Sequence, residues 1–142
     1  MRFLIVEGLI FILLTYLTFG QDMQTDKHPI DLKIEECLSI DSNQSTFGMI
    51  NCIRTAMKEW DAELNKYYNL LMETLTTDEQ EKLRAAQRQW LVYRDKEFEF
   101  IEKFYRNMEG TMWKIVEADS RNNIVRQRAL ELTSYYDTLI FE

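Results

Sequence analysis

One short stretch, Thr76-Thr77-Asp78-Glu79-Gln80, separates two long helical patterns in this sequence of 142 residues. Thr76 with Glu79, or Thr77 with Gln80, has the spacing of a capping box, in which side chains at the start of a helix satisfy its free backbone N–H groups. The stretch therefore predicts that a helix begins here, directly after the previous one ends. A connection this short forces the two helices to run antiparallel.

The apolar residues on both sides of this turn recur at spacings of three and four, which is the period of a helix that buries one face. We expect an all-α fold, with an antiparallel helical hairpin over about 46–75 and 78–107. A third helix over about 111–136 is expected to pack on the hairpin, and the polar run 121–123 could interrupt it. The expected apolar stripe of the second helix comprises Leu83, Ala86, Trp90, Leu91, Phe98, Ile101 and Tyr105.

The overall composition is that of a globular helical domain. The chain is 46% hydrophobic and 29% charged, and four glycines and one proline are too few for a sandwich or barrel rich in tight turns. The net charge of −7 disfavours nucleic-acid binding, which requires a basic surface. The same charge would steer a basic partner toward the protein, although it could also serve solubility alone.

The first 20 residues have the pattern of a secretory signal peptide. Arg2 supplies a short positive region, 9–14 is a compact apolar run, and small residues precede Gln21. An uncleaved membrane anchor is the alternative, but the apolar run is short for a span. We expect a periplasmic or secreted protein with no membrane span after cleavage, a flexible segment over 21–35 and a domain over 36–142.

Export would place the two cysteines, Cys37 and Cys52, in an oxidising compartment, where thiols pair. In an oxidising compartment they are expected to form a disulfide, and closing a loop of this length stabilises by roughly 3 kcal/mol. Two thiols do not complete a zinc site, and the only histidine, His28, lies in a polar segment before Pro29. We therefore expect no metal and no cofactor.

Polar residues lie on or beside the apolar stripes of both hairpin helices. The register set by the turn places Asp61 near Arg94, and Asn65 near Gln87. We expect an interhelical ion pair and a hydrogen bond that lock this register, because slippage would strand buried charges. A ligand or catalytic site is the alternative, but an arginine lowers the pKa of a neighbouring carboxyl group, the wrong direction for a general acid.

The sequence contains no recognisable catalytic constellation. It lacks a glycine-rich phosphate loop, and its single histidine is poorly placed for a catalytic triad. A hydrolase with an unrecognised carboxylate pair is one alternative. The commoner explanation of the many acidic residues is a solvated helix surface, so we expect a protein that is not an enzyme.

Four motifs occur in order along the chain: Cys37, Met49-x-x-Cys52-x-x-x-Ala56, Asp61-x-x-Leu64-Asn65-x-x-Tyr68 and Leu83-x-x-Ala86-Gln87-Arg88-x-Trp90-x-x-Tyr93-Arg94-Asp95. Together they resemble a known family, the LprI-type lysozyme-inhibitor domain of bacterial envelope proteins, over roughly residues 35–136. One departure is the second cysteine pair of many members, since Phe98 occupies the first expected position and no cysteine follows Cys52. Val125 stands where the closing element, which includes Arg128 and Leu132, usually begins with threonine.

The resemblance implies an exported, helical, non-enzymatic protein, some of whose relatives inhibit lysozyme. The partner would then be a lysozyme-like muramidase, and many of these enzymes are basic, so an acidic surface would favour the encounter. The alternative is an envelope interaction or stress module with another protein partner, and the oligomeric state is open. The candidate partner-binding residues are Asp41 and Asn43 in the turn beside the disulfide, and Thr77, Asp78 and Glu79 at the hairpin tip.

Overall fold

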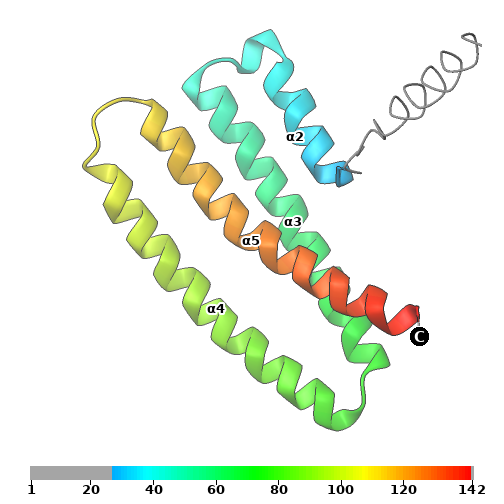
Figure 1. The fold of residues 1–142 in the computed structure, drawn as a ribbon. Coiled ribbons are helices and arrows are strands. Elements are labelled where there is room, and N and C mark those ends of the chain that lie inside the picture. Colours follow the sequence, from blue (N-terminus) through cyan, green and yellow to red (C-terminus); the bar gives the residue numbers. More distant parts are fainter. Residues whose placement is uncertain (1–26, 142) are drawn as a thin grey trace, which may run out of the picture.

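The computed structural model describes residues 27–141 and is all-α within them, which confirms the expected fold class (Figure 1). The predicted signal peptide and the first part of the predicted flexible segment lie outside the described residues. Among the helices described, none is long and apolar enough to cross a membrane. The elements are α2 (Pro29–Ser39), the 3-10 turn η1 (Asp41–Asn43), α3 (Thr46–Thr74), α4 (Thr77–Arg106) and α5 (Met112–Ile140).

The antiparallel hairpin of α3 and α4 is present within one residue of its expected bounds. The capping box is formed by Thr76 and Glu79: the backbone N–H of Thr76 donates to Glu79 Oε2 at 2.9 Å, and Thr76 Oγ1 donates to the same oxygen at 2.7 Å. Gln80 Nε2 also donates to the carbonyl of Leu75 at 2.8 Å, at the end of α3. The turn thus satisfies polar groups of both helices, as the sequence indicates.

α5 is one continuous helix, and the polar run 121–123, which could have interrupted it, does not. Asn122 is buried with an exposed fraction of 4%, while Asn123 Nδ2 donates to Asp119 Oδ2 at 3.2 Å on the outside. Polar side chains lower helix propensity only slightly, and tertiary packing overrides that preference. The helix also extends to Ile140, beyond the expected end near 136.

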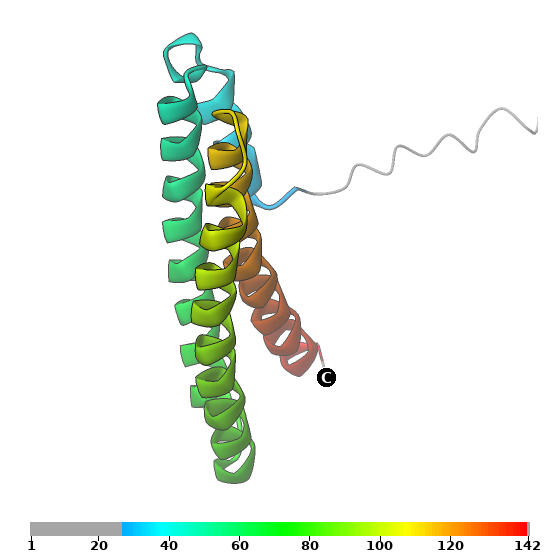
Figure 2. The ribbon, with the colours of Figure 1, turned by 90° about the vertical axis from the view of Figure 1, so that its left-hand side faces the viewer.

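α5 packs mainly against α3, and the core of the protein lies at this interface. α4 packs against α5 and makes little direct contact with α3 (Figure 1). Seen from the α4 side, the turn between α3 and α4 extends past the C-terminal end of α5 (Figure 2). The main buried side chains at the interface are Ala56, Trp60, Leu64, Leu71, Val125, Ala129 and Leu132.

This arrangement changes the expected role of α4. Only Gln87 and Ile101 of α4 are buried, whereas Ala86 and Leu91 of the predicted apolar stripe are exposed. Because α4 has α5 as its main neighbour, part of its apolar arc remains in solvent.

Residues 29–35, expected to be flexible, instead lie in α2. Pro29 occupies the first turn, where a missing N–H costs nothing, and His28 Nδ1 accepts the N–H of Ile30 at 3.3 Å. The His28 ring packs on Trp60 of α3, with ring centroids 4.4 Å apart. His28 is therefore the cap of an ordered helix rather than part of a free arm.

A bidentate ion pair joins α2 to α5. Arg126 Nε and Nη2 donate to the two carboxylate oxygens of Asp31 at 2.9 and 2.6 Å, and its guanidinium lies 5.3 Å from the Trp60 ring centroid. Trp60 thus contacts residues of both neighbouring helices. This geometry fixes α2 across α3 and α5.

The turn between α2 and α3 is fixed covalently and sterically. Cys37 and Cys52 form the expected disulfide, with their Cα atoms 5.8 Å apart. Asn43 Nδ2 donates to the carbonyl of Cys37 at 2.9 Å. The backbone of Asn43 lies so close to Gly48 that a Cβ added to this glycine would stand 2.6 Å from Asn43 Cα. Only glycine fits at this position without a shift of the backbone.

We therefore expect Gly48→Ala to destabilise the protein by about 1–3 kcal/mol, because the added methyl group overlaps backbone rather than a flexible side chain. Ser42→Ala changes an exposed neighbour in η1 and should stay within about 0.5 kcal/mol of the wild type. Urea unfolding of the two variants measures both values. Equal stabilities would contradict this account of the turn.

Candidate functional site

The polar residues of the hairpin do not pair as expected. Gln87 bonds with Arg128 of α5 rather than Asn65 of α3: Arg128 Nε donates to Gln87 Oε1 at 3.0 Å. Arg128 is only 8% exposed, and its Nη1 donates to Glu131 at 2.6 Å. A buried polar contact between helices is therefore present, but it joins α4 to α5 rather than α4 to α3.

Asp61 and Arg94 each have a partner on their own helix instead of forming the expected ion pair. Arg94 Nη2 donates to Asp95 Oδ1 at 2.7 Å, and its guanidinium lies 5.5 Å from the Trp90 ring centroid. Asn65 Nδ2 donates to Asp61 Oδ2 at 3.2 Å and to the Asp61 carbonyl at 2.8 Å. The sequence-based pairing is wrong because α4 packs mainly against α5 and makes little direct contact with α3.

The four polar residues nevertheless converge on one cavity. Asp61 and Asn65 from α3, and Gln87 and Arg94 from α4, line a cavity of about 240 Å³ between the two helices. The sequence thus identified residues that face one another, but not the space between them.

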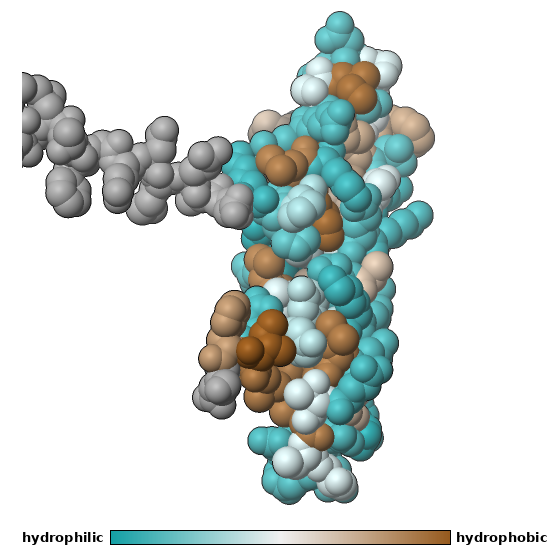
Figure 3. Space-filling view, turned by 90° about the vertical axis from the view of Figure 1, so that its right-hand side faces the viewer, coloured by the Kyte–Doolittle hydropathy of each residue, from teal (hydrophilic) through white to brown (hydrophobic). Residues whose placement is uncertain are grey.

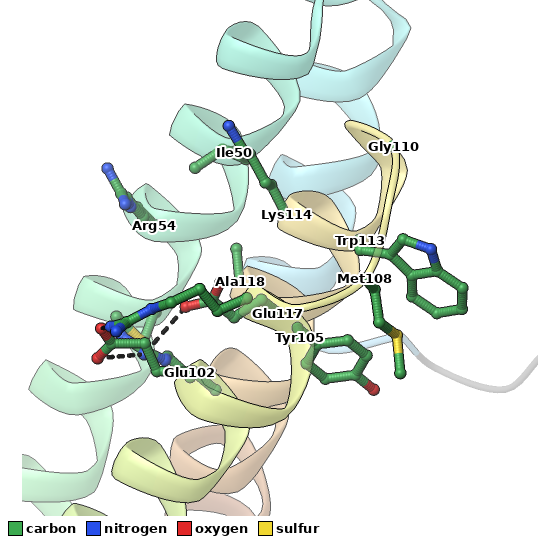
Figure 4. A pocket seen from close by; sticks show the side chains of 13 residues that line it. Ile50, Arg54, Glu102, Tyr105, Met108, Gly110, Trp113, Lys114, Glu117 and Ala118 are labelled. Atoms are coloured by element: carbon green, nitrogen blue, oxygen red, sulfur yellow. Dashed lines mark hydrogen bonds and ion pairs between the residues drawn. The ribbon is translucent and has the colours of Figure 1, made fainter.

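A larger cavity of about 500 Å³ lies farther along α3, between α3, α4 and α5 (Figure 4). Arg121 on its wall pairs with Glu117 at 3.0 Å and with Glu102 at 3.4 Å. Arg54 from α3 and Lys114 from α5 also line it (Figure 4). The sequence pattern gave no signal for this cavity, because its lining comes from three helices whose packing the periodicity does not specify.

The two candidate partner surfaces lie at opposite ends of the molecule (Figure 1). At the η1 end, Asp41 is exposed, but the side chain of Asn43 is bonded to the Cys37 carbonyl and has a structural role. At the other end, the turn bearing Thr77, Asp78 and Glu79 is fully exposed.

The hairpin tip carries a cluster of acidic groups. Four exposed carboxylates lie within nine residues of sequence, and none forms an ion pair within residues 27–141. Hydrogen bonds from the side chain and backbone of Thr76 hold the pKa of Glu79 below its ordinary value of 4.5, so this carboxylate is ionised at neutral pH. The cluster consists of Glu73, Asp78, Glu79 and Glu81.

An apolar hollow adjoins these carboxylates. It has a volume of about 310 Å³ and is formed where the ends of α3 and α5 meet the start of α4. Apolar atoms gather on this face around the C-terminal end of the chain (Figure 3). Ile140 and Phe141 beside it are 56% and 87% exposed. The hollow is lined by Leu71, Leu75, Leu83, Tyr135, Thr138 and Leu139.

We refer to the four carboxylates and this hollow together as the tip surface. An apolar centre with a charged rim is the usual anatomy of a protein–protein interface. Sequence reasoning named Asp78 and Glu79 of this cluster as candidates. It named neither Glu73 and Glu81 nor the hollow, since α5 was expected to end near 136. The apolar residues 139–141 carried the missing signal. Within residues 27–141, no group of three acidic, histidine or cysteine side chains could hold a metal ion.

Substitutions at Gln87 and Asp61 test whether the Gln87–Arg128 hydrogen bond, rather than an Asp61–Arg94 ion pair, stabilises the packing of the helices. Gln87→Leu leaves Arg128 Nε without its acceptor, although Nη1 still donates to Glu131, and should cost about 1.5–3 kcal/mol, the usual worth of a hydrogen bond to a charged group. Gln87→Glu keeps an acceptor oxygen and should retain most of the stability. Asp61→Ala should change the free energy of unfolding by less than about 0.5 kcal/mol. A larger loss in Asp61→Ala than in Gln87→Leu, measured by chemical denaturation, would contradict the assignment.

The capping box should give the protein a measurable acid dependence. Because the folded-state pKa of Glu79 is lowered, its contribution is present above pH 4.5 and is lost as the pH falls through the folded-state value. Glu79→Gln should lack this component, so its stability relative to the wild type should recover at low pH. Glu81→Gln, which leaves the capping box intact, is the matched control. Thermal unfolding at a series of pH values compares the three proteins, and identical profiles would refute the role of Glu79.

Comparison with known proteins identifies the domain. A solved structure of an uncharacterized protein from Burkholderia thailandensis matches with a TM-score of 0.76 and 33% identity. The match covers 79% of this chain but only 55% of that one. No match was found among proteins with curated descriptions. The family model described as lysozyme inhibitor LprI matches residues 37–132. The chain therefore belongs to the LprI lysozyme-inhibitor family.

Proposed function

We propose that this protein binds and blocks a lysozyme-like muramidase through its tip surface, without catalysing a reaction. Family membership supports the class of function. The observation that carries the choice of surface is a set of unpaired carboxylates beside an open apolar hollow. The carboxylates of this surface lie at and beside the α3–α4 turn, which extends past the end of α5 and can enter a cleft (Figure 2).

The two parts of the tip surface have different roles in this proposal. Many lysozymes are basic, so the carboxylates accelerate the encounter and orient the complex. The hollow, with Ile140 and Phe141 at its side, then removes apolar surface from water and supplies affinity. The capping box holds the backbone of the turn in one conformation, which lowers the entropy lost on binding.

The protein would act outside the cytoplasm, in the periplasm or as a secreted protein. The Cys37–Cys52 disulfide is consistent with an oxidising compartment. The signal peptide expected over residues 1–20 would direct the chain there.

Charge reversal at the two ends of the molecule tests the choice of surface. Asp78→Lys with Glu81→Lys should weaken inhibition of a basic lysozyme by at least about tenfold, mainly through slower association. Glu36→Lys with Asp41→Lys makes the same change of charge at the η1 end and should leave inhibition within about twofold. All four side chains are exposed, so the fold should tolerate both changes. Inhibition constants at low and high salt provide the measurement.

Equal losses in the two variants would show that only net charge matters and would remove the tip surface from the proposal. A folded protein that inhibits no lysozyme across a panel of types would contradict the proposed function itself. If a different envelope protein co-purifies with the wild type but not with the tip variant, the chain is an interaction module with another partner.

A further inference from the structure

The two cavities between the hairpin helices lie one after the other along the same helix faces. On α3 the lining residues follow at intervals of three and four, apart from the adjacent Leu64 and Asn65, which places them along one face. From Ile50 to Tyr68 this face is roughly 27 Å long at 1.5 Å per residue. Phe98 lies between the two cavities, with the guanidinium groups of Arg94 and Arg121 at 5.9 and 5.5 Å from its ring centroid. We refer to the two cavities together as the seam groove.

The seam groove is basic although the protein is acidic. The smaller cavity is lined by three arginines and one carboxylate, and the larger by four cationic side chains and two carboxylates. The whole chain carries a net charge of −7. The cationic lining is Arg84, Arg88 and Arg94 in the smaller cavity, and Arg54, Arg106, Lys114 and Arg121 in the larger one.

The carboxylates of the groove are already engaged. Glu102 pairs with Arg106 and Arg121, and Glu117 pairs with Arg121. Asp61 accepts a hydrogen bond from Asn65. Four exposed cations on three helices form no ion pair within residues 27–141 and are available to a ligand: Arg54, Arg84, Arg88 and Lys114.

Aromatic side chains lie along the same groove. Tyr68 and Trp90 line the smaller cavity. Tyr105 and Trp113 line the larger one and stack on each other with ring centroids 5.8 Å apart. A few polar groups placed among apolar and aromatic surface are typical of sites that bind small organic units.

We propose that the seam groove binds a linear glycan that carries carboxylate groups. Guanidinium groups bind carboxylates with paired hydrogen bonds, and the available cations are spread along the groove rather than gathered at one point. The engaged oxygens of Asp61 and Glu102 can still accept bonds from sugar hydroxyl groups. An acidic peptide offers fewer donors for these acceptors, which favours the glycan.

This inference does not rest on the proposed function. The groove is lined by residues along α3, α4 and α5, whereas the tip surface surrounds the turn between α3 and α4. That turn forms one end of the molecule (Figure 1). An inhibitor with both surfaces would be held on an anionic wall polymer while its tip meets the enzyme that cleaves such polymers. Loss of glycan binding should therefore leave inhibition of lysozyme in solution unchanged.

Calorimetric titration of the exported protein at low salt tests the proposal. The probes are oligogalacturonate, soluble uncross-linked peptidoglycan strands, an uncharged chitin oligosaccharide and polyglutamate of matched length. At least one of the two anionic glycans should bind, with an affinity about tenfold or more above the values for chitin oligosaccharide and polyglutamate. Failure of both anionic glycans, or equal binding of the uncharged one, would overturn the proposal. Tighter binding of polyglutamate would assign the groove to acidic polypeptides instead.

A matched pair of variants tests whether the glycan binds in the seam groove. Arg54→Glu with Arg88→Glu should weaken glycan binding by at least about tenfold. Lys58→Glu with Lys103→Glu makes the same change of charge at exposed positions outside the two cavities and should change it by less than about twofold. Both variants should keep the wild-type melting temperature and lysozyme inhibition. Equal losses of glycan binding would show a nonspecific effect of net charge and refute the site.

Discussion

The packing of α5 against α3 is the contact on which the rest of this structure depends. Ala129 and Leu132 of α5 are completely buried, and Trp60 and Leu71 of α3 are 1% exposed beside them. Small residues such as Ala129 allow the two helices to approach closely, and the large ones fill the space between them. α4 then packs against α5 rather than α3.

This placement of α5 explains the polar contacts as well as the core. It brings Arg128 to Gln87 of α4 in a buried contact and Arg126 to Asp31 of α2 in a partly buried one, so one helix makes polar contacts with both α4 and α2. It also prevents the close approach of α3 and α4 that the Asp61–Arg94 pair would need. The space left between these helices is the seam groove, and the far end of α5 completes the hollow of the tip surface.

The resulting surface has charges of opposite sign in different places. Four carboxylates without an ion pair within residues 27–141 lie together at the hairpin tip, while four such cations line the two cavities along the hairpin. A single net charge therefore describes the protein poorly. A basic protein partner and an anionic polymer would be attracted to separate parts of the same domain.

The sequence by itself determined the local features of this protein. The capping box at Thr76 and Glu79 and the helical periodicity predicted the hairpin within one residue, because these signals depend on neighbours in the chain. The two cysteines, read together with an export signal, predicted the disulfide. Pro29 was a short-range signal for α2, but the segment around it shows no sustained helical period. The apolar residues 139–141 were a signal for the end of α5, but they lie beyond the expected end near 136.

Only the tertiary structure decided which helix each polar side chain meets. An antiparallel hairpin allows Gln87 to face either α3 or α5, since its position on α4 fixes a direction but not a neighbour. The choice follows from the apolar volume buried between α3 and α5, a property of residues far apart in the sequence. For the same reason the sequence identified the acidic residues of the tip and the polar residues of the seam, while the hollow and the groove appeared only with the packing.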